Sequence, residues 1–232
     1  MRVVAWDLLG KGDRFGLLRD LSTVLKQAED LGIPTAFHVG ETIYPDTMPT
    51  TYLKVSPADN IREVLKYNNT AHIVHGIALG HMGPSIVDKW LKEGKPVIAA
   101  TISNNLLGYV QSATFHHACF LVNRNVPVAL SHDDAPVFSV KHDITHDFIY
   151  LFYSCINCKA RGMSLMKKLA ETSIRASFCD PEKKKILLSD WHKRWTSWIA
   201  KTARTFILSE NSSYKLLAPV IRTCSIVQRK RG

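Results

Sequence analysis

The stretch TAFHVGET, residues 35–42, places a histidine, a glycine and a glutamate directly after a short apolar run. The preceding segment LGIP is typical of a turn, so the apolar run is predicted to be a short buried strand. His38 and Glu41 therefore fall at the carboxyl end of this strand, with Gly40 between them. Two interpretations fit the pair: both side chains serve one metal-bound water, or they form an ordinary hydrogen-bonded loop pair.

Similar short apolar runs alternate with helix-like segments along the first 134 residues. The expected strands are RVVAWDL (2–8), PTAFHV (34–39), AHIVHGIAL (71–79), KPVIAATI (95–102) and VPVALSHDD (126–134). The expected helices between them cover residues 15–32, 57–68, 83–94 and 112–125. Strands that alternate with helices of this size predict parallel βα units in an α/β fold. Beyond residue 134 the sequence is expected to be largely helical to about residue 208.

The strand starts lie about thirty residues apart, a spacing that fits both a (β/α)₈ barrel and an open doubly wound sheet. The polar residues favour the barrel, because they follow each strand in turn. They are Asp7 and Gly10, His38 and Glu41, His75, Ser103 and Asn104, and Asp133 and Asp134. Strand ends bring such residues together when the strands close round a centre. Only five of eight βα units are expected, so the prediction is a partial barrel.

Composition and charge restrict the class of protein and of partner. The chain has 232 residues, of which 46% are hydrophobic and 22% charged, as in ordinary soluble globular proteins. No apolar run has the length of a membrane span, and the first residues do not resemble a signal peptide. The net charge of +10 makes polyanionic glycans candidate partners, and the excess is concentrated after Lys201. The absence of interleaved aromatic and basic residues argues against nucleic acid.

Five cysteines do not define a disulfide framework that can be deduced from the sequence: Cys119, Cys155, Cys158, Cys179 and Cys224. Cys155 and Cys158 have C-x-x-C spacing but follow the helix-like run HDFIYLFY, and no second pair accompanies them. We therefore expect ordinary cysteines on a helix face rather than a zinc ribbon or a redox motif. Six further histidines are expected in surface or loop positions: His72, His81, His116, His117, His142 and His146.

Together the strand ends offer the groups of a hydrolytic metal site. A catalytic zinc commonly takes three protein ligands and a water whose pKa it lowers. His38 and Asp133 are candidate ligands, Glu41 a candidate general acid and base, and His75 a candidate partner of the attacking hydroxide. Asp134 could accept a hydrogen bond from a substrate. The alternatives are a buried His75 that hydrogen-bonds the backbone, and an Asx turn in SHDDAP.

Five motifs, taken in order, resemble those of the metal-dependent adenosine deaminases: VVAWDLLG, FHVGET, HIVHGIAL, ISNNLL and LSHDDAPVF. The chain is most similar to the secreted branch, the adenosine deaminase-related growth factors, which also have a late helix like HKRWTSWIA. The resemblance covers about residues 2–205. It implies a partial (β/α)₈ TIM barrel of the amidohydrolase type with strands 4–8 present, the front strands missing and a helical carboxyl-terminal end. Residues 206–232 form an unassigned basic tail.

The resemblance also implies an activity and a set of roles. The activity is hydrolytic deamination of adenosine or 2′-deoxyadenosine with one Zn²⁺ per site. His38 and Asp133 match zinc ligands, Glu41 matches the residue that protonates the purine ring, and His75 matches the residue that orients the hydroxide. Asp134 matches a carboxyl that binds the five-membered ring of the purine.

In the same comparison Gly10 matches a backbone donor to the six-membered ring. The chain departs from the family pattern at Val39, Val74, Ala99, Ala100 and Ala135, of which Val74 replaces the first glycine of G-H-G. It also contains no H-x-H pair, which supplies two further zinc ligands in the family. The amino-terminal dimerisation segment of the secreted branch is expected to be absent. The resemblance therefore leaves undecided whether this chain forms the homodimer of the family. The family implies an extracellular location. The alternative to an active deaminase is a non-catalytic remnant that binds purine nucleosides or polyanions, or a truncated form of a longer protein.

Overall fold

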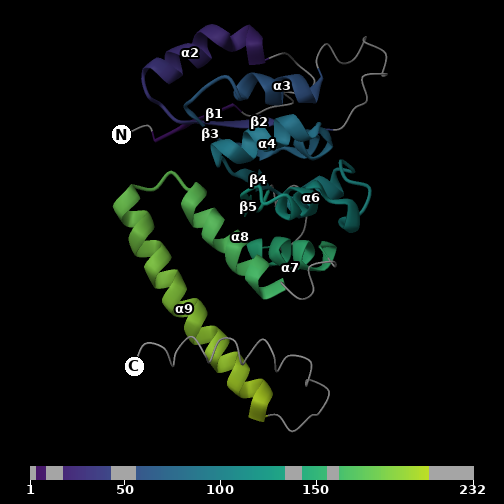
Figure 1. Ribbon diagram of the computed structural model, residues 1–232, viewed down its shortest axis with the longest axis vertical. Helices are drawn as coiled ribbons and strands as arrows, with labels where there is room; N and C mark the ends of the chain where they lie inside the picture. Colours follow the sequence, from purple (N-terminus) through teal and green to yellow (C-terminus); the bar gives the residue numbers. More distant parts are fainter. Residues whose placement is uncertain (1–3, 9–17, 43–55, 134–142, 156–161, 209–232) are drawn as a thin grey trace. The chain divides into compact units, whose positions relative to one another are not determined.

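The computed structural model describes residues 4–8, 18–42, 56–133, 143–155 and 162–208. The chain divides into two compact units, residues 1–178 and 179–232, and each is considered by itself (Figure 1). The predicted boundary between a barrel domain and a tail at residues 205 and 206 stays a prediction, because residues 209–232 lie outside the described part. Within that part, none of the helices combines the length and apolarity needed for a transmembrane span.

Unit 1 is built on a five-stranded parallel sheet. Its strands are β1 (Trp6–Leu8), β2 (Thr35–Val39), β3 (Thr70–His75), β4 (Val97–Ala99) and β5 (Val128–Leu130). Each strand pairs in parallel with the next one along the chain, in the order β1-β2-β3-β4-β5 (Figure 1). A doubly wound sheet has a point where the strand order reverses, whereas consecutive barrel strands do not. The sheet therefore confirms the predicted α/β fold with five parallel strands.

Helices connect the strands and follow the last of them. The connecting helices are α2 (Ser22–Asp30), α3 (Pro57–Val64), α4 (Pro84–Glu93), α5 (Thr101–Leu106) and α6 (His117–Asn123), and β5 is followed by α7 (Ile144–Ser154) and α8 (Gly162–Ala176). Proline occupies the first turn of both α3 and α4, where its missing N–H has no intrahelical partner to lose. Gly94 ends α4 in the left-handed conformation, and Asp143 begins α7 with a capping box.

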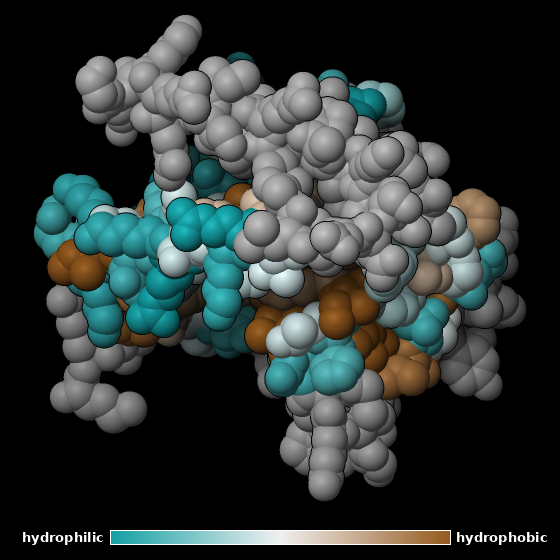
Figure 2. All heavy atoms as spheres, turned by 90° about the horizontal axis from the view of Figure 1, so that it is seen from below, coloured by the Kyte–Doolittle hydropathy of each residue, from teal (hydrophilic) through white to brown (hydrophobic). Residues whose placement is uncertain are grey.

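The core lies where the inner side chains of these helices meet the sheet. Phe37, Ile73 and Val97 from successive strands are fully buried, as are Trp90 from α4 and Leu121 from α6. The surface is less uniform. The face in Figure 2 shows hydrophobic as well as hydrophilic side chains. Leu31 and Phe115 are among the exposed apolar residues. Single exposed apolar residues are normal on protein surfaces and define no site.

All five strands are shorter than predicted, and in β3, β4 and β5 the difference includes the carboxyl end. β3 ends at His75 because His75 and Gly76 both adopt the left-handed conformation, with φ of 63° and 60°. A 3₁₀ turn, Ile77–His81, follows. β4 ends at Ala99, and α5 begins at Thr101, so the ISNN motif is helical rather than extended. The predicted helix over 112–125 shortens to α6.

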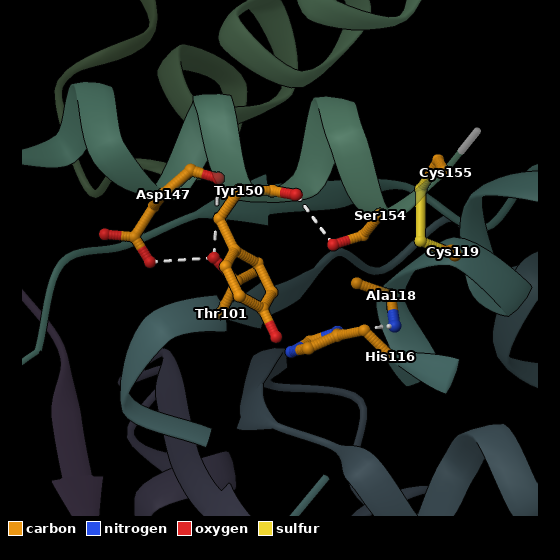
Figure 3. The surroundings of a disulfide bond; sticks show 8 residues. All are labelled: Thr101, His116, Ala118, Cys119, Asp147, Tyr150, Ser154 and Cys155. Atoms are coloured by element: carbon orange, nitrogen blue, oxygen red, sulfur yellow. Dashed lines mark hydrogen bonds between the residues drawn. A yellow bond between two sulfur atoms is a disulfide. The ribbon is translucent and has the colours of Figure 1, made fainter. Parts of the chain in front are cut away.

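The expectation of ordinary helix-face cysteines is wrong for Cys155. Its sulfur forms a disulfide with Cys119, across 36 residues of sequence and 5.5 Å between the Cα atoms (Figure 3). Cys119 lies in α6, and Cys155 is the residue after α7, so the bond ties these two helices together. Cys179 carries a free thiol, and Cys158 and Cys224 lie outside the described residues. Unit 2 contains one long helix, α9 (Pro181–Leu208), in which the Trp191 and Trp195 rings stack.

Candidate active site

The turn after β2 depends on Gly40. This residue has φ of 63°, and a Cβ there would lie 2.6 Å from Ile61 Cδ1, so both the backbone conformation and the packing favour glycine. The Gly40 carbonyl accepts a hydrogen bond from Ala78 N at 2.9 Å, which fixes this turn against the one after β3. His38, in β2, and Glu41, directly after Gly40, therefore lie on either side of a glycine whose carbonyl is held by the turn after β3.

The ends of β1, β2 and β3 bring ionisable side chains together. His38 Nδ1 lies 3.2 Å from Asp7 Oδ1, and the ring centroids of His38 and His75 are 5.3 Å apart. His75 Nε2 lies 3.8 Å from Glu41 Oε1. His75 is nearly fully buried, whereas Glu41 and His38 keep about a fifth of their side chains exposed. The histidine–carboxylate group thus has one buried and one solvent-accessible side.

The first turn of α5 extends this group towards β5. Asn104 Nδ2 lies 3.0 Å from His75 Nδ1, and Ser103 Oγ donates a hydrogen bond to Asp133 Oδ2 at 2.5 Å. With the Asn104 amide so oriented, its N–H donates to Nδ1 of the imidazole, and the ring proton of His75 resides on Nε2, which faces Glu41. Side chains from all five strand ends are therefore linked in one region.

His75 is electrically neutral near pH 7. Burial and, to a lesser degree, the neighbouring His38 charge lower its pKa to about 4, while Asp133 and Asp7 act in the opposite direction. A neutral imidazole with its proton on Nε2 can donate a hydrogen bond to an attacking water. It cannot supply a fixed positive charge at neutral pH.

The backbone of His75 is held by a second histidine. His117, at the start of α6, has its Nε2 2.7 Å from the His75 carbonyl oxygen and donates to it. Burial keeps the pKa of His117 well below its ordinary value, so the ring is neutral. His72 in β3 and His117 in α6 are buried, so their expected surface or loop positions are wrong. His116 lies in the loop before α6, as expected, but is buried too. In the sequence, only the position of His116 and His117 directly before the apolar run ACFLV indicates that a buried helix begins there.

His116 supplies a test of this burial. Its Nδ1 accepts the Ala118 N–H at the start of α6 (Figure 3). Its ring stacks on His117 with centroids 4.5 Å apart. Burial lowers the pKa of His116 to about 4, against an ordinary value of 6.5, although a Thr101 backbone hydrogen bond and the Asp147 charge raise it. Between these pH values the unfolded chain binds a proton that the folded protein excludes. Stability is therefore expected to rise with pH across this window and to fall as the solution is acidified.

We expect His116→Asn to reduce that acid-induced loss of unfolding free energy by up to about 3 kcal/mol between pH 6.5 and pH 4. Asparagine keeps a side-chain acceptor for the first turn of α6 but does not titrate. Urea unfolding of both proteins at several pH values measures the difference. Parallel pH profiles for the variant and the wild type would show that His116 does not resist protonation in the folded protein.

The described residues do not by themselves fit a catalytic zinc. His38 and Asp133 are suitable ligand types, but no group of three or more His, Cys, Asp or Glu side chains in the described residues could hold a metal ion. A catalytic zinc commonly takes three protein ligands. Two of the predicted site residues, Gly10 and Asp134, lie outside the described residues. The roles predicted for His38, Glu41, His75 and Asp133 stay predictions, although the structure places all four at one edge of the sheet.

Several proteins are similar in sequence to most of this chain. Adenosine deaminase 2 of Sus scrofa is 30% identical over 87% of the chain and 38% of its own length. The Homo sapiens protein of the same name is 31% identical over 87% of the chain and 37% of its own length. An adenosine deaminase of Aedes albopictus is 27% identical over 88% of the chain. The chain thus spans less than two fifths of the length of these relatives. No protein-family model matches it.

Solved structures show the same fold. Adenine deaminase from Arthrobacter aurescens superposes with a TM-score of 0.66 and 21% identity, covering 85% of this chain and 53% of its own. The N6-methyl-AMP deaminase from Arabidopsis thaliana gives 0.63 and 23%, covering 82% of this chain and 49% of its own. These matches agree with the predicted partial barrel of the amidohydrolase type. In sequence the chain is thus similar to part of the adenosine deaminases, and in fold it is similar to these solved deaminases.

Proposed function

We propose that the strand ends of unit 1 form the substrate-facing part of a site that hydrolytically deaminates adenosine or 2′-deoxyadenosine. The observation that carries the proposal is the 3.8 Å separation of His75 Nε2 and Glu41 Oε1. This pair lies at the edge of the sheet that also presents His38 and Asp133. The names of the relatives support the same substrate class.

The reaction adds water to C6 of the purine and expels the 6-amino group as ammonia. Addition requires a proton on the neighbouring ring nitrogen, which Glu41 in its acid form would donate. The Nε2–H of neutral His75 would hydrogen-bond to the oxygen of the attacking water and hold it on one face of the ring. Asp134 and Gly10 are proposed to bind the purine itself.

Zinc is proposed as the cofactor of the complete family site, where it acts as a Lewis acid and lowers the pKa of water. His38 and Asp133 would be two of its ligands, and further ligands would have to come from residues other than those described. Because two ligands fall short of a catalytic set, this chain is expected to hold zinc weakly.

The zinc content of the purified chain measures how weakly it binds zinc. After dialysis of the purified chain against a weak chelator, we expect far less than one zinc per chain. Restoring zinc in excess should give a binding isotherm that His38→Ala weakens, with His192→Ala in unit 2 as the matched control. One tightly held zinc per chain would contradict the expectation and would show that another residue completes the set.

The second candidate is a chain that binds purine nucleosides without turning them over. The shortage of metal ligands among the described residues favours this alternative. An assay of adenosine with the purified chain and excess Zn²⁺, with inosine measured by chromatography, separates the two. Inosine formation supports the deaminase. Saturable inosine binding without turnover supports the binding function, and the absence of both would overturn the proposal.

We further propose an extracellular location, because disulfides such as Cys119–Cys155 persist in oxidising compartments. A polyanionic glycan partner stays a prediction that rests on the net charge of +10.

A further inference from the structure

A buried carboxylate lies behind the candidate active site. Asp147, in the first turn of α7, is 1% exposed. Its Oδ1 accepts hydrogen bonds from Thr101 Oγ1 at 2.8 Å and from the backbone N–H of Ile102 at 3.1 Å. Its Oδ2 lies 2.9 Å from His132 Nδ1, which donates to it. Figure 3 shows Asp147 reaching Thr101 from its own helix.

These three donors come from two different strand ends. Thr101 and Ile102 open α5 immediately after β4, and His132 follows β5. Ala100, the residue that precedes α5, has no side chain able to cap the helix. Asp147 therefore supplies from α7 the acceptor that a polar capping residue would ordinarily provide. One carboxylate joins the ends of β4 and β5 to a third element.

The same two segments carry groups of the candidate active site. Ser103 and Asn104 follow Ile102 in the first turns of α5, and they contact Asp133 and His75. Asp133 is the residue after His132. Asp147 itself is not among the groups at the edge of the sheet, so its effect on them passes through the backbone of α5 and of the segment after β5.

Packing alone does not require a carboxylate at this position. Burying a charged group is unfavourable unless it is fully hydrogen-bonded, and an apolar residue would fill the space without that cost. The opposite end of α7 is fixed by the Cys119–Cys155 disulfide to α6, the helix whose His117 donates to the His75 carbonyl. α7 thus connects to the site at both of its ends.

We propose that Asp147 is a positioning residue for this site: its carboxylate sets the β4 and β5 ends in the register at which Asn104 meets His75 and Ser103 meets Asp133. The inference rests on the proposed function in so far as the positioned groups bind a purine nucleoside. Its structural part concerns only the contacts among the side chains, so the two can fail separately.

Asp147→Asn tests the proposal, because asparagine keeps the shape but loses the charge and one acceptor. The readouts are the ring ¹⁵N and ¹H NMR signals of His132 and His75 and the affinity for inosine. We expect the His132 signals to report loss of the Nδ1–H hydrogen bond and those of His75 to move with them. Inosine affinity should fall about 10–100-fold, the size of the effect that loss of an outer hydrogen-bond partner has at metal sites. Asp88→Asn, which removes an exposed ion pair with Arg124, is the matched control.

A second pair of variants serves if Asp147→Asn does not fold. Thr101→Val removes the hydroxyl that donates to Asp147, whereas Thr101→Ser retains it. The proposal expects Val to shift the His75 signals and Ser to leave them near their wild-type positions. Unchanged His75 signals in both Asp147→Asn and Thr101→Val would overturn it. If the variants shift the His75 signals but the wild-type chain binds no inosine, the positioning role is upheld and the proposed function is rejected.

Discussion

Glu41→Gln is expected to lower the rate of inosine formation from adenosine by about 10²–10⁴-fold, the usual contribution of general acid–base catalysis. Glutamine retains the size of the side chain and can still hydrogen-bond, but it has no carboxyl proton to give to the purine ring. Binding of inosine should persist, because the surrounding contacts of His38 and His75 do not depend on the proton. Initial rates with excess Zn²⁺ measure the effect.

Glu93→Gln is the matched control. Glu93 is a similarly exposed glutamate at the end of α4, and its carboxylate pairs with Lys95 at 2.8 Å, away from the strand ends. The control should form inosine at the wild-type rate. Inosine formation by Glu41→Gln at a rate close to that of Glu93→Gln would remove Glu41 from the mechanism.

Replacement of Cys119 and Cys155 by serine is expected to lower the free energy of unfolding by about 4 kcal/mol. The estimate is the conformational entropy that the unfolded chain gains when the disulfide no longer closes a loop between cysteines 36 residues apart. The disulfide also fixes α7, so the double variant should expose the candidate site to larger fluctuations. Denaturant unfolding under non-reducing conditions measures the loss of stability.

Cys179→Ser controls for the removal of a thiol, because Cys179 is free and lies at the start of unit 2. A reducing agent should destabilise the wild type and Cys179→Ser alike and should leave the double variant unchanged. A double variant that unfolds at the wild-type denaturant concentration would show that the disulfide contributes nothing to stability.

Much of the fold could be predicted because it depends on local patterns. Apolar runs such as TAFHV, followed by glycine or a polar turn, predicted the five strands and their parallel arrangement. The carboxyl ends of β3 and β4 could not be predicted as well. β3 ends where His75 adopts a left-handed conformation supported by His117, and α5 begins where Asp147 accepts the Thr101 hydroxyl and the Ile102 N–H. Both supports come from distant parts of the sequence.

The candidate site divides in the same way. His38, Glu41, His75 and Asp133 could be selected from the sequence because each follows a strand, and parallel strands end at one edge of the sheet. Asn104 could be selected in the same way, but its contact with His75 across 29 residues could not be predicted. The same holds for the contact of His117 with His75 across 42 residues and for the disulfide between Cys119 and Cys155 across 36. The local sequence around these residues contains no pattern that predicts such long-range contacts.

The most direct test of nucleoside binding at these strand ends is a titration of the chain with inosine, followed through the ring NMR signals of the histidines. The signals of His38 and His75 are expected to move saturably and to give one dissociation constant, whereas those of His192 in unit 2 should stay in place. Signals of His38 and His75 that do not respond to inosine, or that respond only together with His192, would contradict a purine nucleoside site at this edge of the sheet.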